Sequence, residues 1–365
     1  MRMFFGCVVL LLLAAASGRV CAAEPPIEVR VVVVTMFEVG ADTGDAPGEF
    51  QAWVEREKLN EVLPFPAGYR ALRLNRQTGV LGVVTGVGNT RAAATIMALG
   101  LDERFDLRHA YFVVAGIGGG HPRVVSLGSA VWADWVVDGD LSYELDAREI
   151  PQTTEAERRV WTTGYVPLGK DVPFQEPRTD RFGDDGVRYR MDGGLVRWAY
   201  ELTRDVALHD TVALAAAREH FVPEEAGAPG HRPPFVAVGA DVAASTFWHG
   251  QLLSRWAHDW VRYQTAGEAT YAVCGMEDSG TMQALTFLGK AGRVDARRVL
   301  VLRTVSNYDQ QAHGMTAAES IAQNKVQQYS AYRPALEAAY GVGHVVVDRI
   351  VQQWPAMRER VPGAP

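Results

Sequence analysis

Short apolar runs alternate along the chain with stretches whose apolar residues follow a helical spacing. The runs are rich in β-branched and aromatic residues, which is typical of buried strands, and Asn89 can cap an Ala-rich helix. The predicted strands cover residues 29–35, 69–74, 80–86, 111–116, 129–137, 235–239, 270–275 and 298–305. The predicted helices cover residues 49–63, 90–101, 194–208, 210–220, 245–263, 279–290, 316–340 and 345–353. This alternation predicts an α/β fold, in which helices flank a mixed central sheet.

Residues from about 141 to 190 interrupt the alternation. They are polar, rich in Pro, Gly and Thr, and without a periodic pattern. Segments of this kind run over the surface of a domain. We therefore expect a single domain over residues 24–365 that carries one long surface excursion.

The first 23 residues have the parts of a signal peptide. Arg2 provides the positive charge, residues 4–16 are almost entirely apolar, and Cys21, Ala22 and Ala23 are the small residues of a cleavage site. As a helix the apolar run reaches roughly 20 Å, which is less than the ~30 Å of a bilayer core. The alternative is a retained anchor. We predict a cleaved, soluble protein that is periplasmic or secreted, with Cys274 as its one cysteine and hence no internal disulfide.

Composition narrows the class of protein. The 365 residues are 48% hydrophobic and carry a formal net charge of −7, as a folded globular protein does. No block of Lys or Arg offers the concentrated positive surface that nucleic acids require. We therefore expect no nucleic acid among the partners.

The common cofactor motifs are incomplete in this chain. Residues 164–170 have the spacing of a phosphate-binding loop, but Pro167 lies inside it and Asp171 replaces the required Ser or Thr. The glycine pairs at 86–88 and 116–118 lack the third glycine of a dinucleotide fingerprint. Paired-cysteine and His-Glu-x-x-His metal motifs are also absent from the sequence. We expect neither a bound cofactor nor a metal.

Polar and glycine residues follow several predicted strands. Ligands of α/β sheets bind at the carboxyl ends of the strands, where glycines let backbone N–H groups approach an anion or a sugar. The glycines in such positions are Gly86, Gly88, Gly116, Gly118 and Gly119. At another strand end, the Glu277 carboxylate could accept hydrogen bonds from two ribose hydroxyls at once.

The order of these strand ends resembles the nucleoside phosphorylases and nucleosidases, in which a Met-Glu pair grips the ribose. Several longer motifs are more similar to the purine nucleoside permease family. These motifs cover residues 113–119, 127–129, 143–151, 162–167 and 303–309. The resemblance extends from about Val31 to the C-terminus, and it implies a nucleoside phosphorylase-like fold and a purine nucleoside ligand.

The resemblance implies roles for the residues of this chain that stand at the positions of the family's site residues. Met276 and Glu277 match the ribose-binding pair, and Phe247, Trp248 and Asn307 match residues that contact the base. The catalytic candidates are Glu38, Asn307 and Asp309. Glu38 is near the place where nucleosidases activate water. Asn307 stands where they hold a proton-donating Asp, and because an amide cannot supply that proton, Asp309 is its candidate substitute.

The phosphate-binding arginines of the phosphorylases are not matched. No Arg lies between Tyr111 and Gly120, and Arg91 is the remaining candidate, so phosphate as a co-substrate is in doubt. We expect an exported purine nucleoside-binding protein that takes part in uptake, with cleavage of the N-glycosidic bond as a mechanism behind it. The alternatives are a periplasmic hydrolase or phosphorylase, and a storage or scaffold protein. The expected partners are a purine nucleoside, further copies of the chain and a separate membrane carrier.

Overall fold

The computed structural model describes residues 25–150, 154–161, 163–173, 186–221, 228–323 and 331–363. The predicted signal peptide lies outside the described residues. The strands are β1 (Ile27–Glu28), β2 (Val31–Thr35), β3 (Glu61–Leu63), β4 (Leu72–Asn75), β5 (Val80–Val84), β6 (Phe105–Asp106), β7 (Tyr111–Gly120), β8 (Ala130–Asp138), β9 (Ser142–Glu144), β10 (Tyr165–Pro167), β11 (Arg188–Arg190), β12 (Val236–Ala243), β13 (Tyr271–Gly275) and β14 (Val299–Tyr308). The helices are α1 (Gln51–Arg56), α2 (Asn89–Leu101), α3 (Glu155–Val160), α4 (Gly193–Thr203), α5 (Val212–Glu219), α6 (Gln251–Gln264), α7 (Asp278–Lys290), α8 (Ala317–Gln323), α9 (Tyr332–Gln352) and α10 (Trp354–Glu359).

One ten-stranded mixed sheet organises the chain, which confirms the predicted α/β class. Its strands follow the order β11-β8-β12-β13-β7-β2-β5-β4-β3, and β14 pairs with both β7 and β8. β14 runs parallel to β7 and antiparallel to β8, so β7, β13, β12, β8 and β14 pair in a closed ring. From β7, the strands β2, β5, β4 and β3 extend as an open sheet, and β11 pairs with β8 on the other side of the ring.

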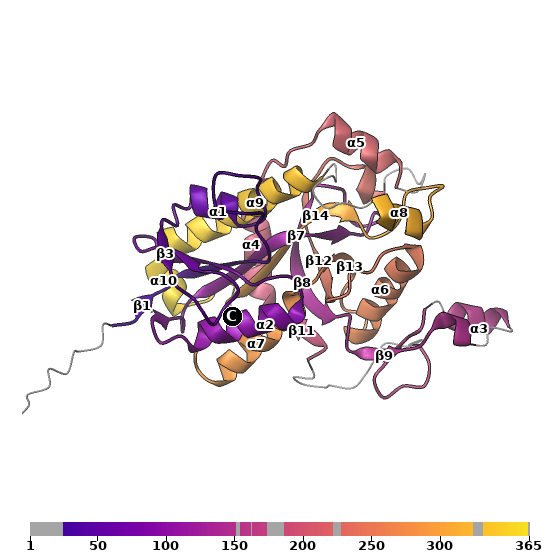
Figure 1. Cartoon of the computed structure of the whole chain (residues 1–365), viewed down its shortest axis with the longest axis horizontal. Helices are drawn as coiled ribbons and strands as arrows, with labels where there is room; N and C mark the ends of the chain where they lie inside the picture. Colours follow the sequence, from indigo (N-terminus) through magenta and orange to yellow (C-terminus); the bar gives the residue numbers. More distant parts are fainter. Residues whose placement is uncertain are drawn as a thin grey trace, which may run out of the picture.

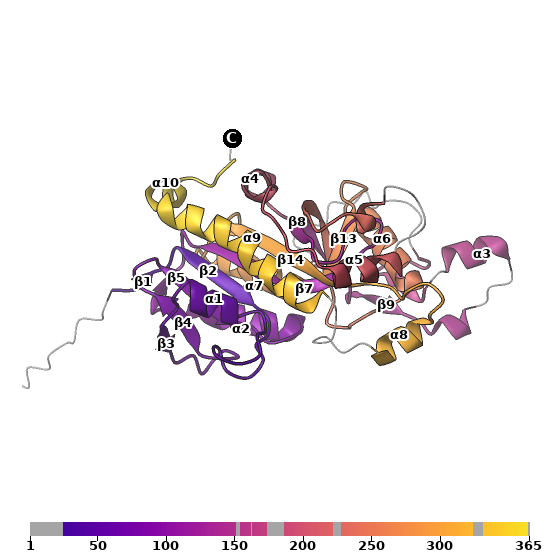
Figure 2. The same ribbon diagram turned by 90° about the horizontal axis from the view of Figure 1, so that it is seen from above.

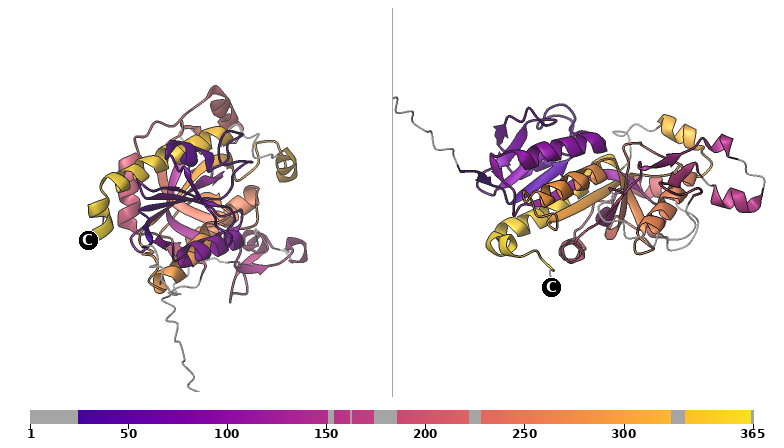
Figure 3. Two further views of the ribbon diagram at one scale, coloured as in Figure 1. Left: turned by 60° about the vertical axis from the view of Figure 1, so that its left-hand side comes forward. Right: turned by 90° about the horizontal axis from the view of Figure 1, so that it is seen from below.

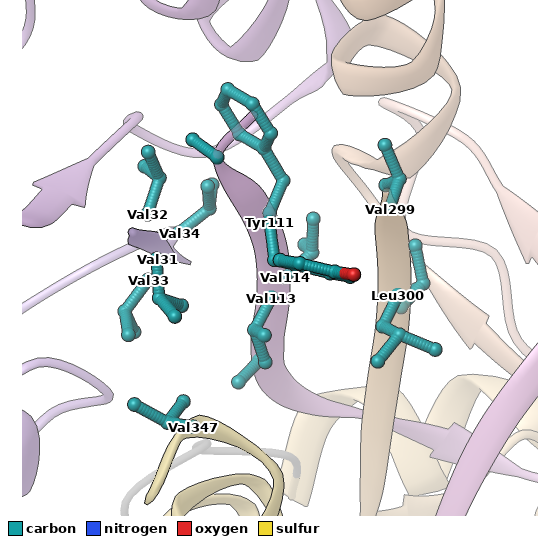
Figure 4. Packing of buried hydrophobic residues seen from close by; sticks show 14 of the residues in the cluster. Val31, Val32, Val33, Val34, Tyr111, Val113, Val114, Val299, Leu300 and Val347 are labelled. Carbon is teal, nitrogen blue, oxygen red and sulfur yellow. The ribbon is translucent and has the colours of Figure 1, made fainter. Parts of the chain in front are cut away.

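Helices cover both faces of the open part of the sheet. Figure 1 shows α1 and α9 on one side of the strands and α2 with α7 on the other. Figure 2 shows α9 running along the sheet, with α4 nearby. The side chains of β2, β7 and β14 pack against one another and against Val347 of α9 (Figure 4). All residues of β2 and β5 are buried, as expected for strands covered on both faces.

The predicted surface excursion forms short elements, of which β11 joins the central sheet beside β8. β9 and β10 pair antiparallel, and α3 begins with a capping box between Thr154 and Glu157. Figure 3 shows α3 at the end of the molecule far from α10. Residues 151–153, 162 and 174–185 of the predicted excursion lie outside the described residues.

Several boundaries differ from the sequence prediction because partner strands decide them. The helix predicted at 49–63 ends at Arg56, since Glu61–Leu63 pairs with β4. The helix predicted at 345–353 is the continuation of α9. The glycine-rich segment after residue 116 is strand, not loop, because β14 pairs with it through Gly120. Asn89 does not cap its own helix, and its side-chain oxygen instead accepts a hydrogen bond from Gly280 N.

Candidate functional site

A cavity of about 380 Å³ lies where the ends of β7, β13 and β14 meet the segment that follows β2. Its volume is within the range of small-molecule sites. Side chains from segments far apart in the sequence line it: Met36, Phe37, Glu49, Phe247, Trp248, Met276, Glu277, Arg303, Asn307, Asp309 and Tyr332 among others. Most of the residues predicted for the site are therefore brought together.

Glu277 is buried on the wall of this cavity, next to Met276. Its Oε1 accepts a hydrogen bond from Gly88 N at 3.2 Å, and its Oε2 accepts one from Met276 N at 3.2 Å. Burial raises the pKa of this carboxyl, and the nearby positive charge of Arg303 opposes that rise. The glutamate is thus held in one place by contacts on both oxygens.

Arg303 is a site residue for which the sequence analysis assigned no role. Its side chain is 2% exposed, and its guanidinium contacts Glu277 Oε2 at 2.9 Å and Asp278 Oδ2 at 2.7 Å. It also donates to the Ile117 carbonyl at 3.0 Å. The available signal is one arginine within the apolar strand β14, because a charge in a buried strand needs partners.

After β2, the acidic residue whose side chain lines the cavity is Glu49. Its Oε2 accepts from Met36 N and its Oε1 from Ile117 N, each at 2.8 Å. Burial is the main cause that raises its pKa from 4.5 to about 8. A side chain at Gly116 would collide with Met36 and with the Glu49 carboxyl, so that glycine makes room for both.

Glu38, which the sequence analysis places in the catalytic role, has a different position. It is not among the residues that line the cavity. Its Oε1 accepts from Val39 N and Gly48 N, and its Oε2 accepts from Phe50 N and Gln51 N. These donors include the free N–H groups at the start of α1. Glu38 therefore holds the loop before α1, and this loop carries Glu49 to the cavity.

Asp309 and Asn307 both reach the cavity from the end of β14. Asp309 is 1% exposed; its Oδ2 accepts from Ser254 Oγ at 2.8 Å and from Tyr271 OH at 2.9 Å. Its Oδ1 has no hydrogen-bond partner among the described residues. The Asn307 amide contacts its neighbours, with Nδ2 donating to the Tyr308 carbonyl and Oδ1 accepting from Ser306 Oγ. Asp309 therefore keeps one buried carboxyl oxygen without a hydrogen-bond partner among the described residues.

The two predicted base-binding aromatics differ in burial. Trp248 is 8% exposed and packs edge-on against Trp256, with 5.8 Å between ring centroids. Phe247 is 46% exposed and lines the same cavity. Trp248 is thus anchored in the protein, whereas Phe247 offers an open ring face at which a planar base can stack.

The predicted glycine loops do not form one anion site. Gly118 and Gly119 line the cavity, but Gly86, Gly88 and Gly116 are not among its lining residues. Gly88 has a φ of 98° and donates its N–H to Glu277, so the anion that it meets is a side chain. Arg91 is also outside the lining, and it donates to the Val87 carbonyl at 2.8 Å.

The described residues hold neither a metal-binding cluster of side chains nor a helix suited to cross a membrane. No group of three or more His, Cys, Asp or Glu side chains is arranged to hold a metal ion in the described ranges. In the same part of the chain, none of the helices combines the length and the apolar character needed to cross a membrane.

Comparisons with known proteins place the chain in a family. The family model described as purine nucleoside permease (NUP) matches residues 28–362. The chain therefore belongs to the purine nucleoside permease family, as its motifs predict. A probable purine nucleoside permease of Schizosaccharomyces pombe is 27% identical over 330 residues, which is 89% of this chain and 90% of that protein. A purine nucleoside permease of Candida albicans is 30% identical over 341 residues, which is 93% of this chain and 78% of that protein.

Similar solved structures have lower sequence identity. A 5′-methylthioadenosine/S-adenosylhomocysteine nucleosidase from Neisseria meningitidis, in complex with methylthio-immucillin-A, is 15% identical with a TM-score of 0.46. The match covers 87% of this chain and 99% of that one. The futalosine hydrolase of Helicobacter pylori is 11% identical with a TM-score of 0.47, and the match covers 88% and 98% of the two chains.

Proposed function

We propose that the cavity binds a purine nucleoside, with Glu277 accepting hydrogen bonds from ribose hydroxyls. The observation that carries this proposal is the Glu277 carboxylate, buried on the cavity wall and held by Arg303 and by backbone N–H groups. A carboxylate fixed in this way is a strong acceptor for paired hydroxyls. The base stacks on Phe247, and its polar edge faces Asn307 and Asp309. Family membership supports the same ligand.

A second candidate function is hydrolysis of the N-glycosidic bond, which two observations favour over phosphorolysis. Among the described residues that line the cavity, Arg303 is the one Lys or Arg, and its guanidinium is already paired with Glu277 and Asp278. A phosphate ion would therefore find no free cation there. The second observation is Glu49, whose pKa of about 8 suits a general base near neutral pH.

Two carboxyl groups share the proton transfers of the hydrolytic step, one as base and the other as acid. The Glu49 carboxylate removes a proton from water as the water oxygen bonds to C1′ of the ribose. The C1′–N bond breaks, and its electron pair goes to the purine. The base receives a proton from the Asp309 carboxyl, whose Oδ1 is the oxygen left without a protein partner. Glu277 holds the ribose while positive charge develops at C1′.

The binding test uses the purified protein with inosine, guanosine and adenosine. Each nucleoside that binds raises the melting temperature. In Glu277→Gln, Asp278 still pairs with Arg303, and we expect affinity to fall about tenfold or more because hydrogen bonds to a charged group are lost. Glu61→Gln is the matched control, since this glutamate pairs with Arg76 far from the cavity lining. Equal affinity in Glu277→Gln and Glu61→Gln would contradict the proposal.

Chromatography of the same mixtures separates binding from cleavage. Free base released without phosphate supports hydrolysis, and release only with phosphate supports phosphorolysis. Intact nucleoside after long incubation, together with a raised melting temperature, leaves the binding function. If none of the nucleosides binds or is cleaved, the purine nucleoside proposal fails, and a storage or scaffold role takes its place.

We also infer that the protein handles nucleosides outside the cytoplasm, in support of uptake through a separate membrane carrier. The apolar N-terminal segment with its small residues at 21–23 supports export. The test is fractionation of cells that express the full chain, followed by N-terminal sequencing of the product. A chain that begins at Glu24 in the exported fraction supports the inference. A full-length cytoplasmic chain would contradict it.

A further inference from the structure

A chain of buried polar groups lies behind Asp309. The Ser254 hydroxyl donates to Asp309 Oδ2 at 2.8 Å, and His121 Nδ1 lies 3.0 Å from the same Ser254 oxygen and 3.6 Å from Asp309 Oδ2. His121 itself is 7% exposed. The ring of His258 packs edge-on against His121, with 4.6 Å between centroids. Glycosidic cleavage as described above does not use these groups.

The hydrogens available to Asp309, Ser254 and His121 determine which atom donates in each of their hydrogen bonds. A serine hydroxyl has one hydrogen, and Ser254 gives it to Asp309. The short contact between His121 and Ser254 is then a hydrogen bond only if Nδ1 carries the proton and donates it. With the proton on Nε2 instead, Nδ1 becomes an acceptor that competes with Asp309 for the serine hydrogen.

Losing the serine hydrogen would change the carboxylate. Asp309 Oδ2 would keep the Tyr271 hydroxyl but would face a lone pair of Ser254 at hydrogen-bond distance. Ser254 also lies on the first turn of α6, where its hydroxyl can instead bond to the carbonyl four residues earlier. A donor on His121 removes the competing acceptor and stabilises the arrangement in which Oδ2 is occupied and Oδ1 is free.

We propose that His121 is a positioning residue for Asp309. Its Nδ1–H, 3.0 Å from Ser254 Oγ and 3.6 Å from Asp309 Oδ2, commits Oδ2 to the protein interior and leaves Oδ1 as the carboxyl oxygen without a protein partner among the described residues. The inference rests on the proposed nucleoside function. The other titratable groups near these polar residues are His249 and His258 on one side and Tyr271 and Cys274 of β13 on the other, with Arg123 acting on His258 and Asp241 on Cys274. Burial lowers the pKa of His258 to about 4, so its ring is neutral against His121 at neutral pH.

The first test reads the tautomer without any substrate. Nitrogen NMR of protein labelled in its nine histidines distinguishes Nδ1–H from Nε2–H, and the His121→Asn spectrum identifies the His121 signals by their loss. We expect His121 to be the Nδ1–H tautomer. The Nε2–H tautomer would overturn the proposal whether or not the protein handles nucleosides.

The second test measures base release and nucleoside affinity in matched variants. An asparagine amide can donate from near the Nδ1 position, so His121→Asn should keep kcat within a few-fold of the original protein. His121→Leu removes the donor and should lower kcat about tenfold or more with little change in Kd. Equal kcat in the Leu and Asn variants would overturn the positioning role. Failure of the unaltered protein to bind any nucleoside would instead overturn the proposed function, and the tautomer measurement would still stand.

Discussion

The carboxyl groups on the cavity are held in two different ways. Near α7, Glu277 and Asp278 contact the Arg303 guanidinium, and Asp241 and Glu49 lie within its electrostatic reach. At the end of β14, Asp309 Oδ2 instead accepts hydrogen bonds from the hydroxyls of Ser254 and Tyr271, and His121 Nδ1 lies 3.6 Å from it. A positive partner favours the ionised form of an acid, whereas hydroxyls position a carboxyl group without supplying charge. One cavity therefore combines carboxyl groups held by a guanidinium with a carboxyl group held mainly by hydroxyls.

Removing the cation should have the largest effect. Arg303→Met leaves Glu277 and Asp278 buried without a positive partner, which typically costs about 3–5 kcal/mol of unfolding free energy. Urea unfolding followed by circular dichroism measures the loss. Asp241→Asn is the matched control in the same cluster. Burial and the neighbouring Asp278 raise the pKa of Asp241 well above its usual range, so a neutral amide should change stability by less than about 1 kcal/mol.

The second prediction concerns the pH dependence that Glu49 creates. Its pKa is raised from 4.5 to about 8, so the folded chain keeps a proton that the unfolded chain releases between these values. The contribution of Glu49 to stability is therefore complete below about pH 4.5 and is lost as pH rises towards 8. Urea unfolding at pH 5 and pH 8 should show a steeper loss than in Glu49→Gln, by on the order of 2–4 kcal/mol.

The slope is the useful quantity in that comparison. Both Glu49 oxygens accept backbone N–H bonds, so the amide of Gln must oppose one donor and adds a cost at every pH. The comparison with Glu49→Gln isolates the slope that depends on Glu49, including its electrostatic interaction with Glu277. Parallel stability curves for the two proteins would show that Glu49 is ionised in the folded chain.

The smallest expected effect belongs to the hydroxyl-held carboxyl group. Tyr271→Phe removes one donor from Asp309 Oδ2 and leaves Ser254 in place, which should cost about 1 kcal/mol of unfolding free energy. Denaturant midpoints measure this change, with the surface variant Tyr69→Phe as control. A loss as large as that of Arg303→Met would show that the two groups of carboxyls are held alike, and the comparison would fail.

The local pattern was enough to predict the eight longer strands and most of the longer helices, but not the short strands β1, β3, β6, β9, β10 and β11. Val31–Thr35 and Val80–Val84 are short β-branched runs that suit few structures other than buried strands. The prediction is wrong where a segment far away in the sequence determines the secondary structure. Residues 116–120 contain glycines that are typical of a loop, but β14 supplies hydrogen-bond partners to them and makes them strand. A sequence pattern does not include such partners.

The sequence by itself determined the alternation of the main strands and helices, the family, and the candidate site residues at Met276-Glu277 and in residues 303–309. Only the tertiary structure decided which carboxyl group reaches the cavity. Glu38 and Glu49 both follow β2, yet the first holds the loop before α1 and the second meets Met36 and Ile117. The role of Arg303 was also decided there. Burial, charge and hydrogen-bond partners set what an ionisable side chain does, and they depend on segments that meet only when the chain is folded.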